Sequence, residues 1–226
     1  MKFSEDYQML LSTISHEIRN PLTLINSYLQ LLAGSYPEIT SSAYWETIES
    51  EIEHLKFLLK DISSYQNSIL LHPKTTNFTT WLSEYKQMIS PLLLSYPEIT
   101  FSCESEQDLP LLEIDVFRFR QVFDNLVRNS IEALSTCGKT NLYLSISAFM
   151  DGDTLCITVT DNGCKIPDEQ VPTLFDPFVT HKSCGTGLGL PITKRIVEAH
   201  HGTVTLSCNS ADKTTFEIRL PAKIHQ

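Results

Sequence analysis

Apolar residues recur at steps of three and four along two stretches near the N-terminus, and each stretch predicts an amphipathic helix. The first helix is expected from about residue 4 to residue 34, before a break at Pro37, and Ser41 or Ser42 can cap the second. The apolar positions are Leu11, Ile14, Ile18, Leu22, Ile25, Leu29 and Leu32 in the first helix, and Trp45, Ile48, Ile52, Leu55, Leu59 and Ile62 in the second. Two such helices joined by a short loop form an antiparallel hairpin.

A hairpin alone cannot bury both sides of these apolar stripes. Pairing with a second copy into a four-helix bundle would bury them, so the pattern predicts a homodimer. Docking of the stripes on the rest of the same chain is the alternative. We expect residues 1–68 to form this dimerisation domain and residues 69–76, which include Pro73, to form a linker.

The pattern changes after the linker to a mixture of helix and strand periods. Helices are expected at about 78–94, 115–135 and 189–200; Asp115 can cap the second of these and Gly138 can end it. Alternating apolar residues predict strands around 142–146 and 155–159, joined by a turn at 151–153, and further strands near 203–208 and 214–220. Helices with a mainly antiparallel sheet predict a two-layer α+β sandwich over residues 77–226.

Composition narrows the class of protein. The formal charge of −10 and the isoelectric point near 5.1 argue against a nucleic-acid-binding face. The six cysteines lack metal-ligand spacing and are typical of reduced thiols inside a cell, so we expect a cytoplasmic location. No apolar run approaches the roughly 20 residues that span a bilayer, and no signal peptide is expected. The chain is therefore expected to be soluble as given, and it could be the cytoplasmic piece of something larger.

Three of the eight glycines lie in Gly185-Thr186-Gly187-Leu188-Gly189, at the start of an expected helix. Free amides at a helix N-terminus bind phosphate, which favours a phosphate loop; a loop that needs positive φ is the alternative. The segment is no Walker A loop, because no Lys-Ser/Thr follows. It also departs from the dinucleotide-binding pattern, because position 190 is leucine and no strand leads into the loop.

Two further groups of polar residues could bind the rest of a nucleotide. Asp161, followed by Asn162 and Gly163 after an expected strand, could accept a hydrogen bond from an exocyclic amine such as that of adenine; the same tripeptide is also a common turn. Asn125 and Asn129 share one helix face, and neutral oxygen ligands suit a Mg²⁺ ion held mainly by phosphates and water. An exposed polar face is the alternative for these two asparagines.

His16 lies beside the apolar stripe of the first helix, within Ser15-His16-Glu17-Ile18-Arg19-Asn20-Pro21, where a large partner could reach its ring. Pro21 removes a backbone donor and should bend the helix beside the histidine. An ordinary surface histidine is the simpler interpretation of this residue alone.

The order of the motifs changes that interpretation. His-Glu-x-x-Asn-Pro, Asn-x-x-x-Asn, Asp-x-Gly, Phe175-Asp176-Pro177-Phe178 and Gly-x-Gly-x-Gly follow one another, and together they resemble the transmitter module of bacterial two-component sensor histidine kinases. The resemblance covers nearly the whole chain. It implies a dimerising hairpin that carries the phosphoacceptor, followed by an ATP-binding sandwich of the Bergerat type, which gyrase and mismatch-repair ATPases share.

In the hairpin, the resemblance implies roles for three residues. His16 would be the phosphoacceptor that attacks the γ-phosphate of ATP. Glu17 would orient the imidazole ring or take its proton, and Asn20 would position a water for dephosphorylation of the partner.

In the sandwich, the resemblance implies that Asn129 binds Mg²⁺ with Asn125 nearby, that Asp161 anchors adenine, and that Gly163 lets the backbone approach the base. The remaining expected nucleotide contacts are Lys182, Gly185, Thr186, Gly187, Leu188 and Gly189.

The implied function is that of an ATP- and Mg²⁺-dependent protein-histidine kinase, which autophosphorylates His16 and transfers the phosphoryl group to an aspartate of a response-regulator receiver domain. The same module would also dephosphorylate that regulator. Its sensor could be a separate protein or a truncated segment.

The sequence departs from the family pattern at two positions. Lys165 replaces the second glycine of Asp-x-Gly-x-Gly, and His201 stands where a second glycine is common before Gly202. Lys165 could weaken nucleotide binding, so two alternatives stay open: a phosphatase or phosphotransfer module with weak kinase activity, and a non-catalytic ATP-binding dimeric scaffold. A gyrase-like ATPase is less favoured, because that class has no use for the His16 hairpin.

Overall fold

The computed structural model describes residues 5–107, 109–181 and 185–222, and for residues 5–14 and 16 it describes the backbone alone. The chain divides into two compact units. The first contains the two N-terminal helices up to Asn67 together with the segment Thr180–Leu188, and the second contains Ser68–Val179 and the residues from Gly189 onward.

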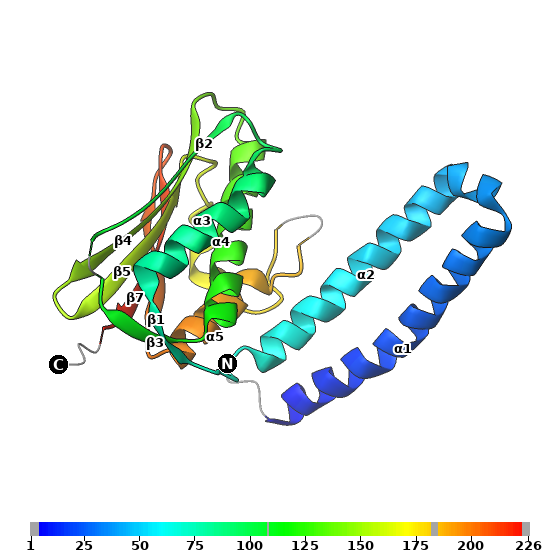
Figure 1. The fold of residues 1–226 in the computed structure, drawn as a ribbon. Helices are drawn as coiled ribbons and strands as arrows, with labels where there is room; N and C mark the ends of the chain where they lie inside the picture. The colour runs from blue at the N-terminus through cyan, green and yellow to red at the C-terminus, as the bar shows by residue number, and fades with distance from the viewer. Residues whose placement is uncertain (1–4, 108, 182–184, 223–226) are drawn as a thin grey trace. The chain divides into compact units, whose positions relative to one another are not determined.

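The first unit is the expected helical hairpin. Helix α1 (Glu5–Ser35) and helix α2 (Ala43–Asn67) are joined by the short 3-10 turn η1 (Pro37–Ser41), and α1 continues through Pro21 (Figure 1). The hydroxyl of Ser42 caps α2 by accepting a hydrogen bond from the amide of Trp45 at 3.2 Å. The buried core between the helices is formed by Leu22, Ile52 and Leu59, with Leu29 packed against it.

The hairpin buries only part of its apolar stripes. The members that face away from the core are Ile18, Ile25, Leu32, Ile48 and Leu55, and each of these side chains is between 42% and 51% exposed. The two stripes are therefore wider than a single pair of helices can cover. This is the surface that the sequence pattern assigns to a second copy of the chain.

The second unit is the expected sandwich of helices on a sheet. Its five-stranded sheet has the order β2-β4-β5-β7-β6, in which β2 runs parallel to β4 and all other neighbours are antiparallel. The strands are β2 (Ile99–Ser105), β4 (Leu142–Asp151), β5 (Thr154–Asp161), β6 (Thr203–Asn209) and β7 (Thr214–Pro221). The helices α3 (Phe78–Leu93), α4 (Val116–Thr136) and α5 (Gly189–Ala199) cover one face of this sheet, and the short turn η2 spans Val171–Thr173 (Figure 1).

Three strands were not expected from the sequence. Besides β2, these are β1 (Lys74–Asn77) and β3 (Leu111–Ile114), which pair antiparallel in a separate two-stranded sheet. Strand β1 overlaps the end of the expected linker at 69–76. Its sequence Lys-Thr-Thr-Asn has no apolar alternation, so the strand depends on pairing with β3 and cannot be recognised locally.

An aromatic cluster fixes α4 against α3. Trp81 lies edge-on to Phe123 with ring centroids 5.0 Å apart, and Tyr85 lies edge-on to the same ring at 5.1 Å. Phe78 and Phe119 are fully buried beside them. A fully buried phenylalanine contributes about 1.5–3 kcal/mol, so this cluster holds α4 rigidly in place.

The C-terminus of α5 explains how the chain accommodates His201. The amide of Gly202 donates to the carbonyl of Val197 and the amide of His201 donates to the carbonyl of Glu198, both at 2.9 Å, in a Schellman motif. His201 has φ +62°, a left-handed conformation that costs a non-glycine residue about 1–2 kcal/mol. A Cβ atom on Gly202 would lie 2.5 Å from the carbonyl oxygen of Arg219, so only this second position requires glycine.

Asp115 caps α4 and also holds the segment that enters the second unit. Its Oδ1 atom accepts hydrogen bonds from the amides of Phe117 and Arg118, as the sequence predicted for a cap. Its Oδ2 atom accepts a hydrogen bond from the amide of His72 at 2.8 Å. These bonds lower the pKa of the Asp115 carboxyl below its usual value, against the opposing effect of burial.

His200 is buried between α4 and the end of α5. Its Nε2 atom accepts a hydrogen bond from the amide of Asp115 at 2.9 Å, and its Nδ1 atom lies 2.7 Å from the carbonyl oxygen of Ile196, to which it can only donate. The rings of Phe119 and His200 are nearly perpendicular, with their centroids 4.8 Å apart. The neutral tautomer therefore satisfies both nitrogens, and protonation of Nε2 would break the bond to Asp115.

The stability of the second unit is expected to decrease in mild acid because of His200. Burial lowers the pKa of His200 below its usual value of 6.5, so the unfolded chain binds a proton more readily than the folded chain. The free energy of unfolding should then fall as the pH drops below about 6.5. Urea unfolding at pH 7.5, 6.0 and 5.0 should show a smaller decrease in His200→Gln than in the wild type. The exposed control His201→Gln should keep most of the wild-type slope, because burial lowers the pKa of His200 more than the charge of His201 does. Parallel pH profiles for wild type and His200→Gln would rule this explanation out.

Candidate functional site

A buried carboxylate stands at the end of β5. Asp161 is 2% exposed; its Oδ2 atom accepts a hydrogen bond from the hydroxyl of Ser130 at 2.7 Å, and its Oδ1 atom accepts one from the amide of Gly163 at 2.9 Å. Burial raises the pKa of the Asp161 carboxyl above its usual value, although these two hydrogen bonds and the charge of Lys139 act in the opposite direction. Each carboxylate oxygen can accept a second hydrogen bond, so Asp161 retains capacity for an amine donor of a ligand.

An unsatisfied hydroxyl lies opposite this carboxylate. Thr214 of β7 pairs directly with Asp161 in the antiparallel register, which places both side chains on the same face of the sheet. Thr214 is 4% exposed, and within the part of the chain that the structure describes its Oγ1 atom has no hydrogen-bond partner. Leaving a buried hydroxyl unpaired costs about 1–3 kcal/mol, so the site is suited to a ligand that supplies an acceptor.

Together these groups match the edge of adenine. An exocyclic amine would donate to Asp161, and an adjacent ring nitrogen would accept from Thr214. Sequence reasoning found Asp161 but missed Ser130 and Thr214. Their signal is weak, because a serine within α4 and a threonine within β7 become informative only when the fold places them against Asp161.

The loop after β5 packs tightly against α4 at Gly163. A Cβ atom at this position would lie 2.8 Å from the backbone carbon and the Cβ atom of Ala133. The amide of Cys164 also donates to the carbonyl of Ala133 at 3.3 Å. We expected Gly163 to permit approach to the base, but its close neighbour in the structure is α4; a contact with nucleotide stays a prediction.

Lys165, which replaces the second glycine of the family pattern, points to the surface. Its Nζ atom lies 2.8 Å from the carboxylate of Asp168, and the lysine side chain is 40% exposed. The next residue, Ile166, is held at both backbone groups by the side-chain amide of Asn209, at 3.0 and 2.9 Å. The replacement therefore leaves the loop anchored and puts no bulk into its packing.

The two asparagines of α4 have different surroundings. Asn125 is 5% exposed; its Nδ2 atom donates to the carbonyl of Gly189 at 2.9 Å, and its Oδ1 atom accepts from the guanidinium of Arg128 at 2.9 Å. The Nδ2 atom of Asn125 thus links α4 to the start of α5, while its Oδ1 atom is bonded within α4; the sequence suggested that Asn125 is a neighbour of the metal. Asn129, one turn further along, is half-buried and stays the predicted Mg²⁺ ligand.

The glycine-rich loop leads directly into α5, which begins at Gly189. Gly187 has φ +65°, and the amide of Leu188 donates to the hydroxyl of Thr186 at 3.2 Å. Gly189 has ordinary space for a Cβ atom, whose nearest neighbour would be 3.7 Å away in Asn125. The positive φ of Gly187 fits the alternative that this glycine is needed for the conformation of the loop. The first amides of α5 and the residues Gly185–Leu188 stay the predicted phosphate site. Lys182 lies outside the described residues.

The phosphoacceptor motif lies on α1. His16 belongs to the helix, but its side chain lies outside the described part of the chain. Glu17 and Asn20 are both exposed within one turn of it. The guanidinium of Arg19, between them, donates to the hydroxyl of Ser63 on α2 at 2.8 Å.

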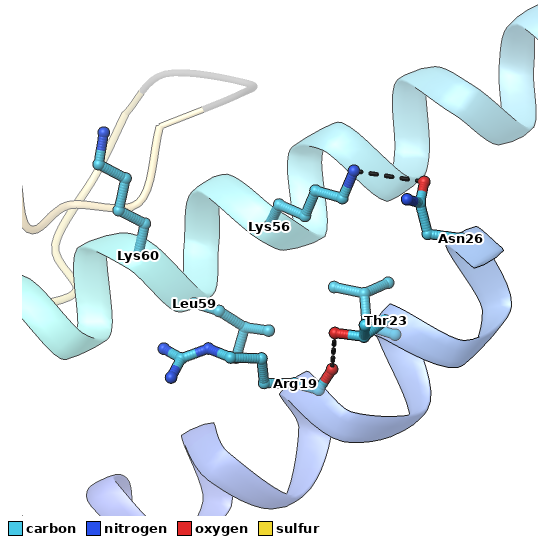
Figure 2. A pocket seen from close by; sticks show the side chains of 7 residues that line it. Arg19, Thr23, Asn26, Lys56, Leu59 and Lys60 are labelled. Atoms are coloured by element: carbon cyan, nitrogen blue, oxygen red, sulfur yellow. Dashed lines mark hydrogen bonds between the residues drawn. The ribbon is translucent and has the colours of Figure 1, made fainter.

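A basic cavity of about 360 Å³ lies between the two helices of the hairpin and begins one turn after His16 (Figure 2). The ammonium of Lys56 donates to Asn26 at 3.3 Å and to Glu53 at 2.6 Å. The lining residues are Arg19, Leu22, Thr23, Asn26, Lys56, Leu59 and Lys60. Three cationic side chains thus line one cavity in a chain of net charge −10, and one of them, Lys56, is already paired with Glu53.

Among residues 5–107, 109–181 and 185–222, no helix is both long and apolar enough to cross a membrane.

Two protein-family models match the chain. Residues 7–68 match the His Kinase A (phospho-acceptor) domain, and residues 114–224 match the histidine kinase-, DNA gyrase B-, and HSP90-like ATPase. These ranges coincide with the hairpin and with most of the sandwich.

Similar proteins include two bacterial kinases. Sporulation kinase B of Bacillus subtilis is 32% identical over 217 residues, which are 95% of this chain and 50% of the relative. The sensor histidine kinase ZraS of Escherichia coli is 30% identical over 218 residues, which are 95% of this chain and 45% of the relative. The chain therefore spans about half the length of these relatives.

Solved structures of histidine kinases share the fold. ThkA in complex with the response regulator protein TrrA matches 96% of this chain and 62% of its own, with a TM-score of 0.67 and 26% identity. Full-length ShkA in complex with AMPPNP matches 94% of this chain and 45% of its own; its TM-score is 0.76, and at 22% identity the likeness concerns the fold alone.

Proposed function

Because this chain is a transmitter module of the two-component sensor histidine kinases, with a phosphoacceptor hairpin followed by an ATP-binding domain, we propose that it phosphorylates its own His16 with ATP and passes the phosphoryl group to a response regulator. The observation that carries the proposal is the buried carboxylate of Asp161 opposite the unsatisfied hydroxyl of Thr214. This pair is suited to adenine, and it occurs in the same chain as His16.

The sandwich binds ATP in this proposal. Asp161 accepts a hydrogen bond from the exocyclic amine of adenine, and the hydroxyl of Thr214 donates one to the adjacent ring nitrogen. The first amides of α5 and the loop at 185–188 bind the phosphates, because the free amides and the dipole at the N-terminus of a helix stabilise anions. Mg²⁺, held by the phosphates and by the side-chain oxygen of Asn129, would neutralise charge on the phosphate oxygens.

Phosphoryl transfer to His16 uses the lone pair of its unprotonated ring nitrogen. That nitrogen attacks the γ-phosphorus in line; the new N–P bond forms as the bond to the bridging oxygen breaks, and ADP leaves. Glu17 orients the ring through its other nitrogen and stabilises the positive charge that develops there. The N–P bond then breaks as an aspartate oxygen of the receiver domain attacks, which regenerates neutral His16.

Two surfaces of the hairpin suit two protein partners. The exposed apolar residues Ile18, Ile25 and Leu32 of α1, with Ile48 and Leu55 of α2, suit a second copy of the chain in a four-helix bundle. The cavity lined by Arg19, Lys56 and Lys60 (Figure 2) begins on α1 three residues after His16, so it suits the acidic surface of a receiver domain that presents its aspartate to His16.

A second activity is supported by Asn20. This residue is exposed on α1 one turn after His16, where its amide could position a water for hydrolysis of the receiver's aspartyl phosphate. The alternative of a weak kinase rested on Lys165. In the structure Lys165 pairs with Asp168 at the surface; an effect of Lys165 on nucleotide binding stays a prediction, which the nucleotide affinity of Lys165→Gly compared with the wild type tests.

The proposal is tested by incubating the purified chain with γ-labelled ATP and Mg²⁺. We expect labelled protein whose label is lost in acid, stable in base and absent from His16→Ala. The control His54→Ala removes a histidine of α2 and should retain the label. Label that persists in His16→Ala would refute His16 as the acceptor, and nucleotide binding without any label would support a non-catalytic scaffold.

A further inference from the structure

Lys139 connects two distant loops of the sandwich. It lies between α4 and β4, directly after Gly138, whose φ of +64° turns the chain at the end of α4. The ammonium of Lys139 donates to the carbonyls of Asn162 at 2.8 Å and Gly163 at 3.0 Å, and also to the carbonyl of Ala211. All three donors of the ammonium are thereby used on main-chain oxygens.

These contacts act on the loop that carries the adenine site. Asn162 and Gly163 directly follow Asp161, and Ala211 lies in the turn between β6 and β7, 72 residues from the lysine. The side chain of Asn162 adds two further bonds, because it accepts from the amide of Tyr143 at 2.8 Å and donates to the carbonyl of Asn141 at 3.0 Å. The loop after β5 is therefore held both by the ammonium of Lys139 and by the bonds from the side chain of Asn162 to the segment that begins β4.

We propose that Lys139 is a positioning residue of the nucleotide site: it fixes the loop at residues 161–163 and supplies a positive charge that keeps Asp161 ready to accept the amine of adenine. This inference rests on the proposed function, because it assumes that Asp161 binds adenine. It assigns to Lys139 a role through Asp161, without contact to the nucleotide.

The charged surroundings of Asp161 support this role. Lys139 lowers the pKa of the Asp161 carboxyl, in opposition to burial, and so favours the charged acceptor. Tyr143 of β4 also faces this region, and its own pKa is raised by burial first and then by nearby groups, so it is neutral. Those nearby groups are Asp161, Cys208 and Asp212. Removing Lys139 would leave the effect of burial on Asp161 opposed only by the hydrogen bonds from Ser130 and Gly163, which favours protonation of the carboxyl.

The experiment compares four variants of the full chain by calorimetric titration with Mg²⁺-AMPPNP at pH 8.0 and pH 6.0. Lys139→Met removes both charge and hydrogen bonds, Lys139→Gln keeps donors but no charge, and Lys139→Arg keeps both. Lys213→Met removes an exposed lysine of the same β6–β7 turn and is the matched control. Circular dichroism establishes that each variant is folded.

We expect Lys139→Met to weaken AMPPNP binding about tenfold at pH 8.0, the loss that corresponds to charge-assisted hydrogen bonds. The loss should be larger at pH 6.0, because more of the Asp161 carboxyl is protonated there. Lys139→Gln should bind almost normally at pH 8.0 and more weakly at pH 6.0, while Lys139→Arg and Lys213→Met should follow the wild type at both values. If Lys139→Met does not fold, the contrast between Lys139→Gln and Lys139→Arg carries the test.

Two outcomes would overturn the inference. Equal weakening of the methionine and glutamine variants at both pH values would indicate a purely structural lysine, and wild-type affinity in both would indicate no role. Failure of the proposed function is distinguishable, because then the wild-type chain itself would not bind AMPPNP.

Discussion

Replacing Asp161 with asparagine is expected to weaken the binding of AMPPNP by at least about 100-fold, because the ligand amine would meet a second donor. The amide of Gly163 donates to Oδ1, so the asparagine oxygen must stay there. Its NH₂ group then occupies the position of Oδ2, near Ser130, and faces the exocyclic amine of adenine. Calorimetric titration of the variant with Mg²⁺-AMPPNP measures the effect.

Loss of binding in Asp161→Asn should not reflect loss of the fold. Burial raises the pKa of Asp161, which means that the folded chain disfavours the charged carboxylate, so a neutral isostere should leave the free energy of unfolding at pH 8 equal or higher. Asp168→Asn removes an exposed aspartate of the following loop and should bind AMPPNP like the wild type. An affinity of Asp161→Asn within about threefold of the wild type would contradict the assignment of the adenine site.

Replacing Gly163 with alanine is expected to destabilise the second unit by about 1–3 kcal/mol, the cost of forcing a methyl group into a packed region. The added Cβ would lie 2.8 Å from the backbone of Ala133, and α4 cannot yield because the cluster around Trp81 and Phe123 holds it. The loop after β5 must therefore shift, which should also weaken nucleotide binding about tenfold or more. Urea unfolding and AMPPNP titration measure the two effects.

Gly189 supplies the matched comparison. A Cβ atom there would meet Asn125 at an ordinary 3.7 Å, so Gly189→Ala should change the free energy of unfolding by less than about 0.5 kcal/mol. Equal stability of the two alanine variants would refute the close packing at Gly163. The comparison separates two glycines that the motif pattern treats alike.

The sequence predicted the parts of the fold that carry their own local signals. The cap at Asp115, the glycine stop at Gly138 and the three- and four-residue steps of α1 and α2 gave helices within about two residues of those observed. Strands β6 and β7 were likewise expected from the sequence, near residues 203–208 and 214–220. Strand β1 was missed, because a four-residue polar segment becomes a strand only through its partner β3.

The candidate site was predictable where a motif marks a residue and unpredictable where the fold brings partners together. Asp161 was found by its motif, whereas Ser130 and Lys139 contact its loop from 31 and 24 residues away along the chain. The sequence placed Asn125 on the same helix face as Asn129, but periodicity cannot show that Asn125 bonds to the start of α5. Lys165 departs from the family pattern, and the structure places its side chain at the surface beside Asp168; its effect on nucleotide binding stays a prediction.

The strand order also has a consequence for the sequence of events in folding. The hairpins β4–β5 and β6–β7 pair strands that follow one another in the sequence. The pairing of β5 with β7 instead joins distant segments. Thr160 and Thr215, for example, are 55 residues apart in the sequence, and their hydroxyls lie 3.0 Å apart. Contacts between distant segments form late, because a long loop must close before they yield free energy. Asp161 and Thr214 come together only when β5 pairs with β7. We therefore expect the nucleotide site to be among the final features of the domain to form, so that ATP binds only to chains in which the sheet is already complete.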